Sequence, residues 1–272
     1  MPNPRYTVVI PVLNQLKYTS QCVESLLAHG LPAQSILVID NGSTDGTPAW
    51  LASRRDIRHV RNDINLGCGG AWTQGALLSD SDWTVLLNND TVCAHNFIEA
   101  QIASAERRGL EVVSPAMVES DLDYDLAPFT ASFVRTMGDT VREGWFHGVC
   151  FSVHRTVFQR VGFLDTDRLL YGREDAEFLA RCERHAIRVG TVGDAFLHHF
   201  GMITQTAMKR ELGIRKFGDH RYFYAKVGLN WWGRQRHKFA RKSRTKRWVA
   251  DERARTGMTL HMVHREHRVE YR

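Results

Sequence analysis

The tripeptide Asn88-Asn89-Asp90 has the chemistry expected of a site for a divalent cation. It directly follows the apolar run 83–87, which predicts a buried strand. A carboxylate at a strand end can bind a hard cation through oxygen, and that cation can neutralise the charge on a departing diphosphate. Asp90 could equally cap a helix beginning near His95 or shape a turn, so the tripeptide alone leaves both interpretations open.

Two adjacent acids, Glu174-Asp175, form a second candidate site at the start of an amphipathic helix predicted over 174–185. A carboxylate held in a cleft can act as a general base toward an attacking hydroxyl. Acids in a first helical turn also complement the helix dipole, which is a purely structural role. Because adjacent helical residues project in different directions, we expect at most one of the two to face a substrate.

A pair of histidines, His198-His199, follows an apolar run at a predicted strand end. Either imidazole could bind a metal, although a histidine is more often a solvated or core residue. The five cysteines are scattered singly without a CxxC pair, so neither a zinc knuckle nor a disulfide framework is indicated.

A glycine-rich segment at 63–71 precedes a helix and could bring backbone amides close to a diphosphate. It has neither the lysine and spacing of a P-loop nor a GxGxxG pattern. By itself this segment is weak evidence for phosphate binding.

Strand and helix signals alternate through the first ninety residues. The pattern predicts strands near 6–10, 36–39, 57–60 and 83–87, with a helix over 18–28 and another from Pro48. Strands separated by single helices predict an α/β fold with a Rossmann-like, doubly wound, mainly parallel sheet. Ligands of such sheets lie beyond the carboxyl ends of the strands, which draws attention to Asn14, Asp40 and Asp90.

The second half of the chain is less regular. Residues 119–143 are acidic and interrupted by Pro128 and Gly138, so we expect a long loop or an insertion on the acceptor side. Apolar alternation returns at 145–153, followed by a short helix over 155–161 and strand segments at 187–192 and 195–199.

Composition and charge place the chain among globular proteins. Hydrophobic residues make up 43% and charged residues 24% of the 272 residues, and no apolar run is long enough for a membrane span. The N-terminal residues lack a signal-peptide pattern, so we expect a cytoplasmic protein. Residues 208–272 carry 19 Lys/Arg against 6 Asp/Glu, whereas residues 1–207 carry 17 against 24. The sequence therefore predicts an acidic body with a basic, helical C-terminal extension.

Four N-terminal motifs occur in a familiar order. They are Val9-Ile10-Pro11-Val12-Leu13-Asn14, Val38-Ile39-Asp40-Asn41-Gly42-Ser43-Thr44-Asp45-Gly46, Asn65-Leu66-Gly67 and Leu87-Asn88-Asn89-Asp90-Thr91. This order resembles glycosyltransferase family 2, which has the GT-A fold, and within it the branch of rhamnosyl- and related transferases. The later half is similar too, and its matching residues are Gly148, Arg155, Val161-Gly162-Phe163-Leu164-Asp165, Tyr171, Glu174-Asp175, Arg181 and His198-His199.

The resemblance implies a GT-A domain over 1–207, with a nucleotide-sugar half over about 1–110 and an acceptor and catalytic half over about 111–207. Residues 208–272 would be a separate extension. In the donor site, Asp40 would hydrogen-bond the nucleobase in a pocket lined by Pro11 and Asn14. Asn65 and Gly67 would contribute to the same nucleotide site.

The resemblance also implies a metal and a catalytic base. Asn88-Asn89-Asp90 stands in the DXD position of the family, so Asp90 would bind Mn²⁺ or Mg²⁺ and Asn88 would lie near the sugar or ribose. His199 would complete the metal site, with His198 as the alternative. Asp175 matches the base of an inverting transfer from a UDP- or dTDP-linked sugar to a glycan or a lipid-linked acceptor, as in surface polysaccharide or glycoconjugate synthesis.

Three departures from the family pattern bear on specificity. Asn88 replaces the first acid of DXD, which lowers the charge at the metal. Trp72 and Thr73 stand where relatives often carry asparagine, so we expect a different donor pocket. Residues 119–143 match no family motif, and we expect acceptor choice to reside there or nearby.

The basic extension leaves several interpretations open. Residues 234–247 hold eight Lys/Arg and no acid, and tryptophans and a phenylalanine are interleaved over 231–248. Such a segment suits an anionic membrane surface at the inner face of the cell membrane. It could instead be a solvated tail or a helix docked on the acidic body, whereas nucleic-acid binding is disfavoured because no binding motif is present.

Two other functions compete with transfer. A sugar nucleotidyltransferase of similar architecture needs a glycine-rich phosphate loop with Lys or Arg near the N-terminus, and none follows Ile10. A non-catalytic basic binding module would be indifferent to changes at Asp90 or Asp175.

Overall fold

The computed structural model describes residues 5–201, 203–211, 220–265 and 268–272. Its strands are β1 (Tyr6–Val12), β2 (Ile36–Asp40), β3 (Arg58–Arg61), β4 (Trp83–Leu87), β5 (Thr91–Cys93), β6 (Val112–Glu119), β7 (Val141–Glu143), β8 (Cys150–His154), β9 (Val189–His199), β10 (His261–Arg265) and β11 (Arg268–Tyr271). Its helices are α1 (Leu16–Ala28), α2 (Thr47–Ser53), α3 (Gly67–Leu77), α4 (Phe97–Arg108), α5 (Leu126–Met137), α6 (Arg155–Val161), α7 (Glu174–Arg184), α8 (Ile203–Glu211), α9 (His220–Lys226) and α10 (Trp231–Thr256), with short 3₁₀ helices η1 (Ala33–Ser35) and η2 (Arg168–Leu170).

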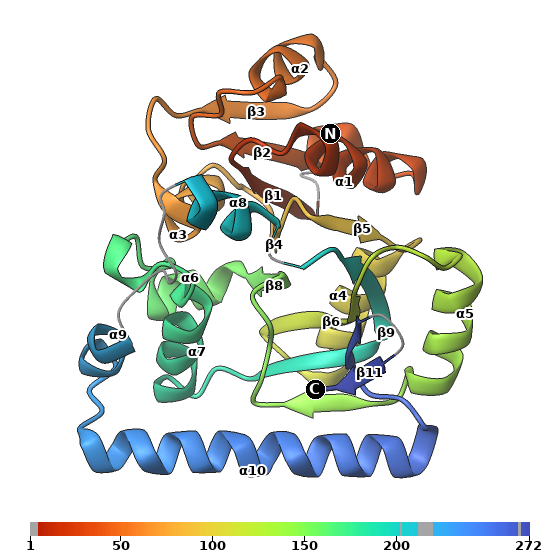
Figure 1. The fold of residues 1–272 in the computed structure, drawn as a ribbon, viewed down its shortest axis with the longest axis vertical. Helices are drawn as coiled ribbons and strands as arrows, with labels where there is room; N and C mark the ends of the chain where they lie inside the picture. The colour runs from red at the N-terminus through yellow and green to blue at the C-terminus, as the bar shows by residue number, and fades with distance from the viewer. Residues whose placement is uncertain (1–4, 202, 212–219, 266–267) are drawn as a thin grey trace.

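The described strands form one sheet in the order β11-β10-β6-β8-β4-β1-β2-β3, to which β9 adds β5 and β7 (Figure 1). Strands β3, β2, β1 and β4 are parallel, whereas β8 runs antiparallel between β4 and β6. The sheet is therefore parallel in its N-terminal half and mixed beyond it. This arrangement confirms the predicted α/β class and the four N-terminal strands.

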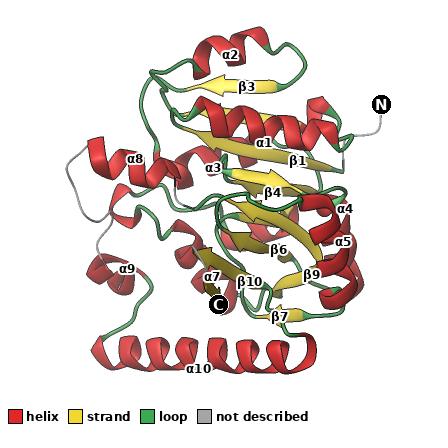
Figure 2. Cartoon of the chain, turned by 45° about the vertical axis from the view of Figure 1, so that its right-hand side comes forward, coloured by secondary structure: helices red, strands yellow, loops and turns green. Residues whose placement is uncertain are grey.

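Both faces of the parallel half are buried. Val8 and Ile10 of β1 belong to one hydrophobic core together with α1, whereas Val9 belongs to a second core together with α3. Because side chains alternate along a strand, β1 can supply both cores only if helices cover both faces of the sheet. This layering is the physical basis of the doubly wound arrangement (Figure 2).

The expectation of a long loop over 119–143 is wrong. Glu119 ends β6, helix α5 follows, and β7 completes the segment. The Oδ1 of Asp125 accepts a hydrogen bond from the Ala127 N–H and caps α5. Pro128 lies in the first turn of this helix, where a missing N–H removes no helical hydrogen bond, and Gly138 stands at its C-cap. The two residues taken as breakers therefore mark the ends of a helix.

The two strand segments predicted over 187–199 form one continuous strand, β9. Its pairing with β6 shifts register between Pro115 and Ala116, which accommodates the break in the apolar pattern at Gly193 and Asp194. The strand ends at His199, beside the carboxyl end of β6.

The basic extension contains α10, and the chain after it returns to the sheet. Strand β10 pairs parallel with β6, and Leu260 and Met262 are buried in the first core. The predicted helical character of the extension is confirmed, and the boundary after residue 207 stays a prediction. Within the described ranges, none of the helices combines the length and apolar character that crossing a bilayer requires.

Candidate active site

A cavity of about 240 Å³ lies at the carboxyl ends of β1 and β4. Seven of the residues predicted from the sequence line it, namely Pro11, Asn65, Asn88, Asn89, Asp90, Asp175 and His199. Residues that line it without having been predicted as site residues include Cys68, Trp72, Tyr171, Glu174 and Thr204. Among the described residues, Asn14, Asp40, Gly67 and His198 were predicted but do not line the cavity.

Asp90 is held by two contacts in the turn between β4 and β5. Its Oδ2 accepts a hydrogen bond of 3.0 Å from the Ile203 N–H, and its Oδ1 lies 3.4 Å from His199 Nε2. The side chain does not cap α4, whose N-cap is Asn96. Burial alone would raise the pKa of Asp90, but the contact with His199 outweighs it and lowers the pKa. Asp90 is therefore a carboxylate facing the cavity.

The two histidines of β9 point to opposite faces of the sheet, as adjacent strand residues must. His199 lines the cavity, and its Nδ1 lies 3.6 Å from the Oε2 of Glu119. Burial would lower the pKa of His199, but Asp90 and Glu119 raise it to about 9. His198 is fully buried on the other face, where its Nδ1 lies 2.9 Å from the Tyr124 hydroxyl and burial lowers its pKa to about 4.

The donor set at this end of the cavity fits a divalent cation. A buried carboxylate and an imidazole present oxygen and nitrogen to the same space, and both nitrogens of His199 lack a well-formed hydrogen bond in the described structure. Mn²⁺ accepts such a mixed set, and Mg²⁺ accepts the carboxylate together with phosphate oxygens and water. Within the described ranges no group of three or more His, Cys, Asp or Glu side chains could hold a metal by itself. Ligands from a diphosphate and water would have to complete the coordination.

Glu174 and Asp175 both line the cavity from the first turn of α7, although we expected at most one to face it. Two glycines make room for them. A Cβ on Gly148 would collide with the Oδ2 of Asp175, and one on Gly69 would lie 2.9 Å from the Cγ of Glu174. Burial raises the pKa of Glu174 to about 7 and also raises the pKa of Asp175, against the opposing effect of nearby backbone amides.

Asn14 and Asp40 support the turn after β2. The Oδ1 of Asn14 accepts hydrogen bonds of 2.7 Å and 3.3 Å from the N–H groups of Thr44 and Asp45. The Oδ1 of Asp40 accepts one of 2.8 Å from the Ser43 N–H, and its buried Oδ2 lies 3.9 Å from Arg61 Nη1. In this structure both residues shape the loop beside Pro11. The nucleobase contact of Asp40 stays a prediction.

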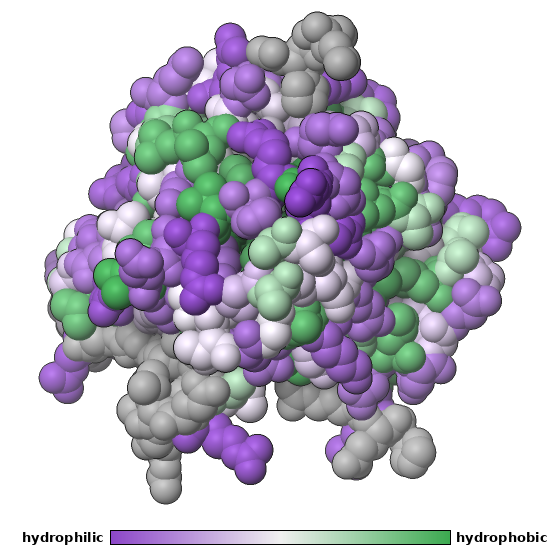
Figure 3. Space-filling view, turned by 90° about the horizontal axis from the view of Figure 1, so that it is seen from above, coloured by the Kyte–Doolittle hydropathy of each residue, from purple (hydrophilic) through white to green (hydrophobic). Residues whose placement is uncertain are grey.

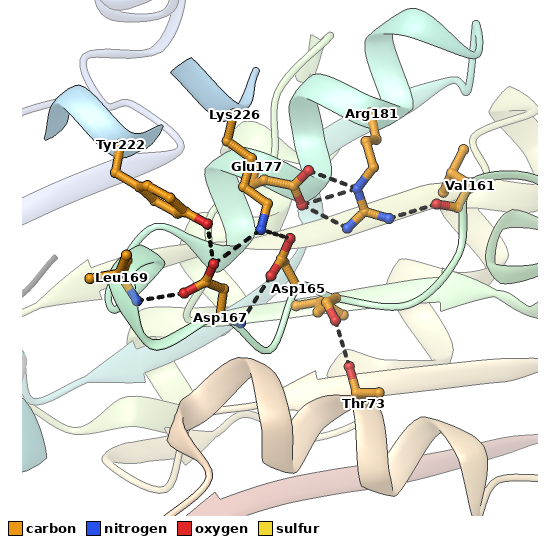
Figure 4. A network of polar contacts seen from close by, with 10 residues as sticks. Thr73, Val161, Asp165, Asp167, Leu169, Glu177, Arg181, Tyr222 and Lys226 are labelled. Atoms are coloured by element: carbon orange, nitrogen blue, oxygen red, sulfur yellow. Dashed lines mark hydrogen bonds and ion pairs between the residues drawn. The ribbon is translucent and has the colours of Figure 1, made fainter. Parts of the chain in front are cut away.

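The segment 165–172 contributes Tyr171 and Gly172 to the cavity lining and is fixed from two directions, of which Figure 4 shows the contacts with α9. Lys226 of α9 places its Nζ 2.6 Å from Asp165 Oδ2 and 3.5 Å from Asp167 Oδ2, while the Tyr222 hydroxyl donates to Asp167. From the other side, Asn65 donates a hydrogen bond of 3.2 Å to the Tyr171 hydroxyl. The segment therefore joins the donor-side loop to the C-terminal part of the chain.

Sequence reasoning missed three contributors to this site. Glu119 could have been found, because it ends a strand at the edge where ligands bind. Glu174 was recognised only as the neighbour of a base. Trp72 was noted only as a departure in the donor pocket, and its indole N–H, which has no partner among the described residues, was not anticipated.

The Asp90 carboxylate with its neighbouring imidazole and the Asp175 carboxylate therefore share one cavity beyond the carboxyl ends of parallel strands, where ligands of α/β sheets bind. Residues 7–173 match the model of Glycosyl transferase family 2. This match covers more than half of the chain, so the chain belongs to glycosyltransferase family 2.

Curated relatives match parts of the chain. An alignment of 175 positions with the N-acetylglucosaminyl-diphospho-decaprenol L-rhamnosyltransferase of Mycobacterium tuberculosis is 27% identical and covers 50% of this chain and 57% of that protein. An alignment of 111 positions with the glycosyltransferase GlyG of Streptococcus pneumoniae is 24% identical and covers 39% of this chain and 37% of that protein. The chain therefore spans between about a third and three fifths of the length of these relatives.

Solved structures confirm the GT-A fold. S. aureus TarS (residues 1–349) superposes with a TM-score of 0.57 at 13% identity, over 82% of this chain and 69% of that one. The mannosyltransferase PcManGT of Pyrobaculum calidifontis, solved with GDP-Man and Mn²⁺, superposes with a TM-score of 0.56 at 20% identity, over 72% of this chain and 57% of that one. At these identities the likeness concerns the fold.

Proposed function

We propose that this chain is an inverting, metal-dependent glycosyltransferase that moves a sugar from a nucleotide diphosphate donor to an acceptor hydroxyl. The observation that carries the proposal is the convergence of Asp90, His199 and Asp175 on one cavity at the carboxyl ends of the strands. Membership of the family supports the reaction class, and the arrangement of side chains supports the proposed roles.

Asp90 and His199 would hold Mn²⁺ or Mg²⁺ on the donor side. When bound, the cation stabilises the negative charge that develops on the departing diphosphate. The Ile203 N–H fixes one oxygen of Asp90 and leaves the other toward His199, which orients the carboxylate without neutralising it. Asn88 and Asn89 line the same part of the cavity with neutral amides, close to the expected position of the donor.

Asp175 would be the general base. Its carboxylate takes the proton of the acceptor hydroxyl as the oxygen bonds to the anomeric carbon, and the bond from that carbon to the diphosphate oxygen breaks with its electron pair. One displacement inverts the anomeric configuration. Burial, which raises the pKa of Asp175, makes this carboxylate a stronger base than an exposed one.

Donor and acceptor are the finer part of the proposal. TarS has been solved with UDP and with UDP-GlcNAc, and PcManGT with GDP-Man, so neighbours of this fold take nucleotide sugars. The resemblance to rhamnosyltransferases favours a UDP- or dTDP-linked donor and a glycan or lipid-linked acceptor. A role in surface polysaccharide or glycoconjugate synthesis and a cytoplasmic location stay predictions.

The test separates donor binding from chemistry. Asp175→Asn is expected to lower turnover by about 10²- to 10⁴-fold, because the base is lost while the donor contacts remain. Donor binding, measured by calorimetry with Mn²⁺ present, should stay at the wild-type level. Glu183→Gln, in the last turn of the same helix, is the matched control and should turn over normally. Unchanged turnover in Asp175→Asn would remove Asp175 from the mechanism.

A screen of nucleotide sugars by thermal shift, with and without Mn²⁺, identifies the donor class. A ligand that binds only the folded state raises the melting temperature, and the increase grows with the logarithm of the ligand concentration above its Kd. Metal-dependent stabilisation by a nucleotide diphosphate sugar is expected. Indifference to every nucleotide, together with salt-dependent binding through α10, would favour the non-catalytic basic module.

A further inference from the structure

Helix α10 carries a row of exposed aromatic and basic side chains on one face. The row consists of Trp232, Arg236, Phe239, Lys246 and Arg247. Steps of three and four residues keep these positions on the same side of a helix, with Ser243 completing the spacing between Phe239 and the two cations. Trp232 is 70% exposed and Phe239 76% exposed, so two large apolar side chains face solvent among cations. We call this row the outer face of α10.

The opposite side of α10 is the side that contacts the body. Glu252 is buried and accepts hydrogen bonds of 2.7 Å and 2.8 Å from Arg142, which fixes the C-terminal end of the helix. Arg244 lies 4.0 Å from Glu183 of α7, and Arg234 lies 4.7 Å from the ring centre of Tyr224 on α9. The body therefore occupies one side of the helix and leaves the outer face accessible.

Charge distinguishes this edge of the molecule. Eight Lys/Arg and no acid occur over 234–247, and within the described chain no ion pair joins Arg236, Lys246 or Arg247 to a carboxylate. The helix is straight and runs along one edge of the molecule (Figures 1 and 2). The opposite end, which carries α2 and β3, shows hydrophilic side chains mixed with separate hydrophobic groups (Figure 3).

We propose that the outer face of α10 docks the protein on a bilayer surface that contains anionic phospholipids. The cations would approach the lipid headgroups while Trp232 and Phe239 enter the interface beside them, which is the usual arrangement for helices that lie on a membrane. A nucleic acid is the other polyanion with this chemistry. Single-stranded binding normally places aromatic side chains in a charged groove, whereas these project from the convex side of one helix.

The helix α7 connects this surface to the catalytic cavity. Asp175 stands in its first turn and Glu183, the contact of Arg244, in its last. Eight residues of α-helix separate them by about 12 Å along the axis. The thickness of α10, about 10 Å, adds to this distance, so a protein seated on the outer face would hold its base at roughly 20–25 Å from the lipid headgroups, where a lipid-linked acceptor presents its sugar. Docking itself does not depend on the proposed transfer reaction.

The experiment measures partitioning of the full chain onto vesicles of phosphatidylcholine alone or with phosphatidylglycerol. Binding is expected only to the anionic vesicles and is expected to fall steeply between about 0.05 M and about 0.5 M salt. The triple variant Arg236→Gln/Lys246→Gln/Arg247→Gln should lower the partition coefficient by about 100-fold. The pair Trp232→Ala/Phe239→Ala should also lower it, with less effect on the salt dependence.

Arg55→Gln/Arg135→Gln is the control, because it removes two exposed cations that lie after α2 and on α5 rather than on α10. It should bind vesicles nearly as well as wild type. Equal losses in control and triple variant, or equal binding to neutral vesicles, would overturn the proposal. Tight binding of a single-stranded oligonucleotide without vesicle binding would replace it with a nucleic-acid site. Donor binding with Mn²⁺, measured in the same variants, should be unchanged, which separates this result from the test of the transfer reaction.

Discussion

Glu174 is 5% exposed beside Asp175, and burial raises its pKa from the ordinary value of 4.5 to about 7. A carboxyl group whose pKa is higher in the folded state stabilises the fold in its protonated form. This contribution is fully present below pH 4.5 and is lost as the pH rises through about 7. A shift of this size corresponds to about 3 kcal/mol of unfolding free energy.

Glu174→Gln is therefore expected to remove a pH dependence of stability. Wild type should lose about 3 kcal/mol relative to this variant between acidic and neutral pH, since only wild type must ionise a buried carboxyl group. Urea unfolding at both pH values measures the difference. Asp80→Asn, at an exposed carboxyl, is the control and should follow wild type at both pH values. If the unfolding free energy of Glu174→Gln changed with pH as it does in wild type, Glu174 would not be the source of this pH dependence.

Trp72 is a second residue that can be tested. It is 3% exposed, it lines the cavity, and its buried indole N–H has no partner among the described residues. A buried donor of this kind is expected to bind a ligand oxygen. Trp72→Phe should lower kcat/KM by about tenfold through the loss of one hydrogen bond. Trp83→Phe, at an equally buried tryptophan of β4 outside the lining, should lose stability without this kinetic effect.

At the scale of elements, the sequence predicted a helix or strand correctly where its local pattern is typical of a single type of structure. The strands over 6–10 and 83–87 were predictable because their β-branched and apolar runs are buried on both faces. The helix α5 was not, because Pro128 and Gly138 mark helix ends as readily as loops and only the buried Phe133 and Met137 decide between them. Strand alternation likewise separates His199 from His198, once the continuous strand β9 is known.

The ion pair between Arg142 of β7 and Glu252 of α10 joins two elements that are far apart in the sequence. Both side chains are buried, and Glu252 also accepts a hydrogen bond of 2.9 Å from the Leu260 N–H. Removing one partner leaves the other charge buried and unpaired, so Glu252→Ala should lower the free energy of unfolding by about 3–5 kcal/mol. Hydrogen exchange should also become faster in β10.

The double variant Arg142→Met/Glu252→Leu is the informative comparison. It removes both charges and leaves none unpaired, so it should be more stable than Glu252→Ala. If the double variant were less stable than Glu252→Ala, the ion pair itself would add to the free energy of unfolding, beyond the cost of leaving one charge unpaired.

At the scale of the whole molecule, the distribution of charge predicted a boundary between residues 1–207 and 208–272. The sheet crosses that boundary, because β10 and β11 belong to it. Net charge depends on surface residues and says little about the core. The apolar residues that bring the chain back to β6 lie in a short run at 258–263 within a basic segment. The cavity itself was predictable from strand ends and motif order. Its wall at 165–172 was not, because α9 reaches it from a distant part of the sequence.

Truncation tests this organisation. Ending the chain after residue 207 removes Leu260 and Met262 from the first core and is expected to give an unstable or aggregated protein. Removing only 268–272, which contain the edge strand β11, should leave the fold intact. Circular dichroism and size-exclusion chromatography of the two truncated proteins measure the outcome. A well-folded 1–207 fragment would show that the extension is an independent addition.

The pairing of β10 with β6 has a consequence for biosynthesis. Met262 lies opposite Val118 in the register of the two strands, although 144 positions separate them in the chain. At about 5–20 residues per second, a ribosome needs about 7–30 s to add that length. During this interval residues 117–119 of β6 lack the strand that later pairs with them, so their unpaired backbone groups are open to pairing with another chain.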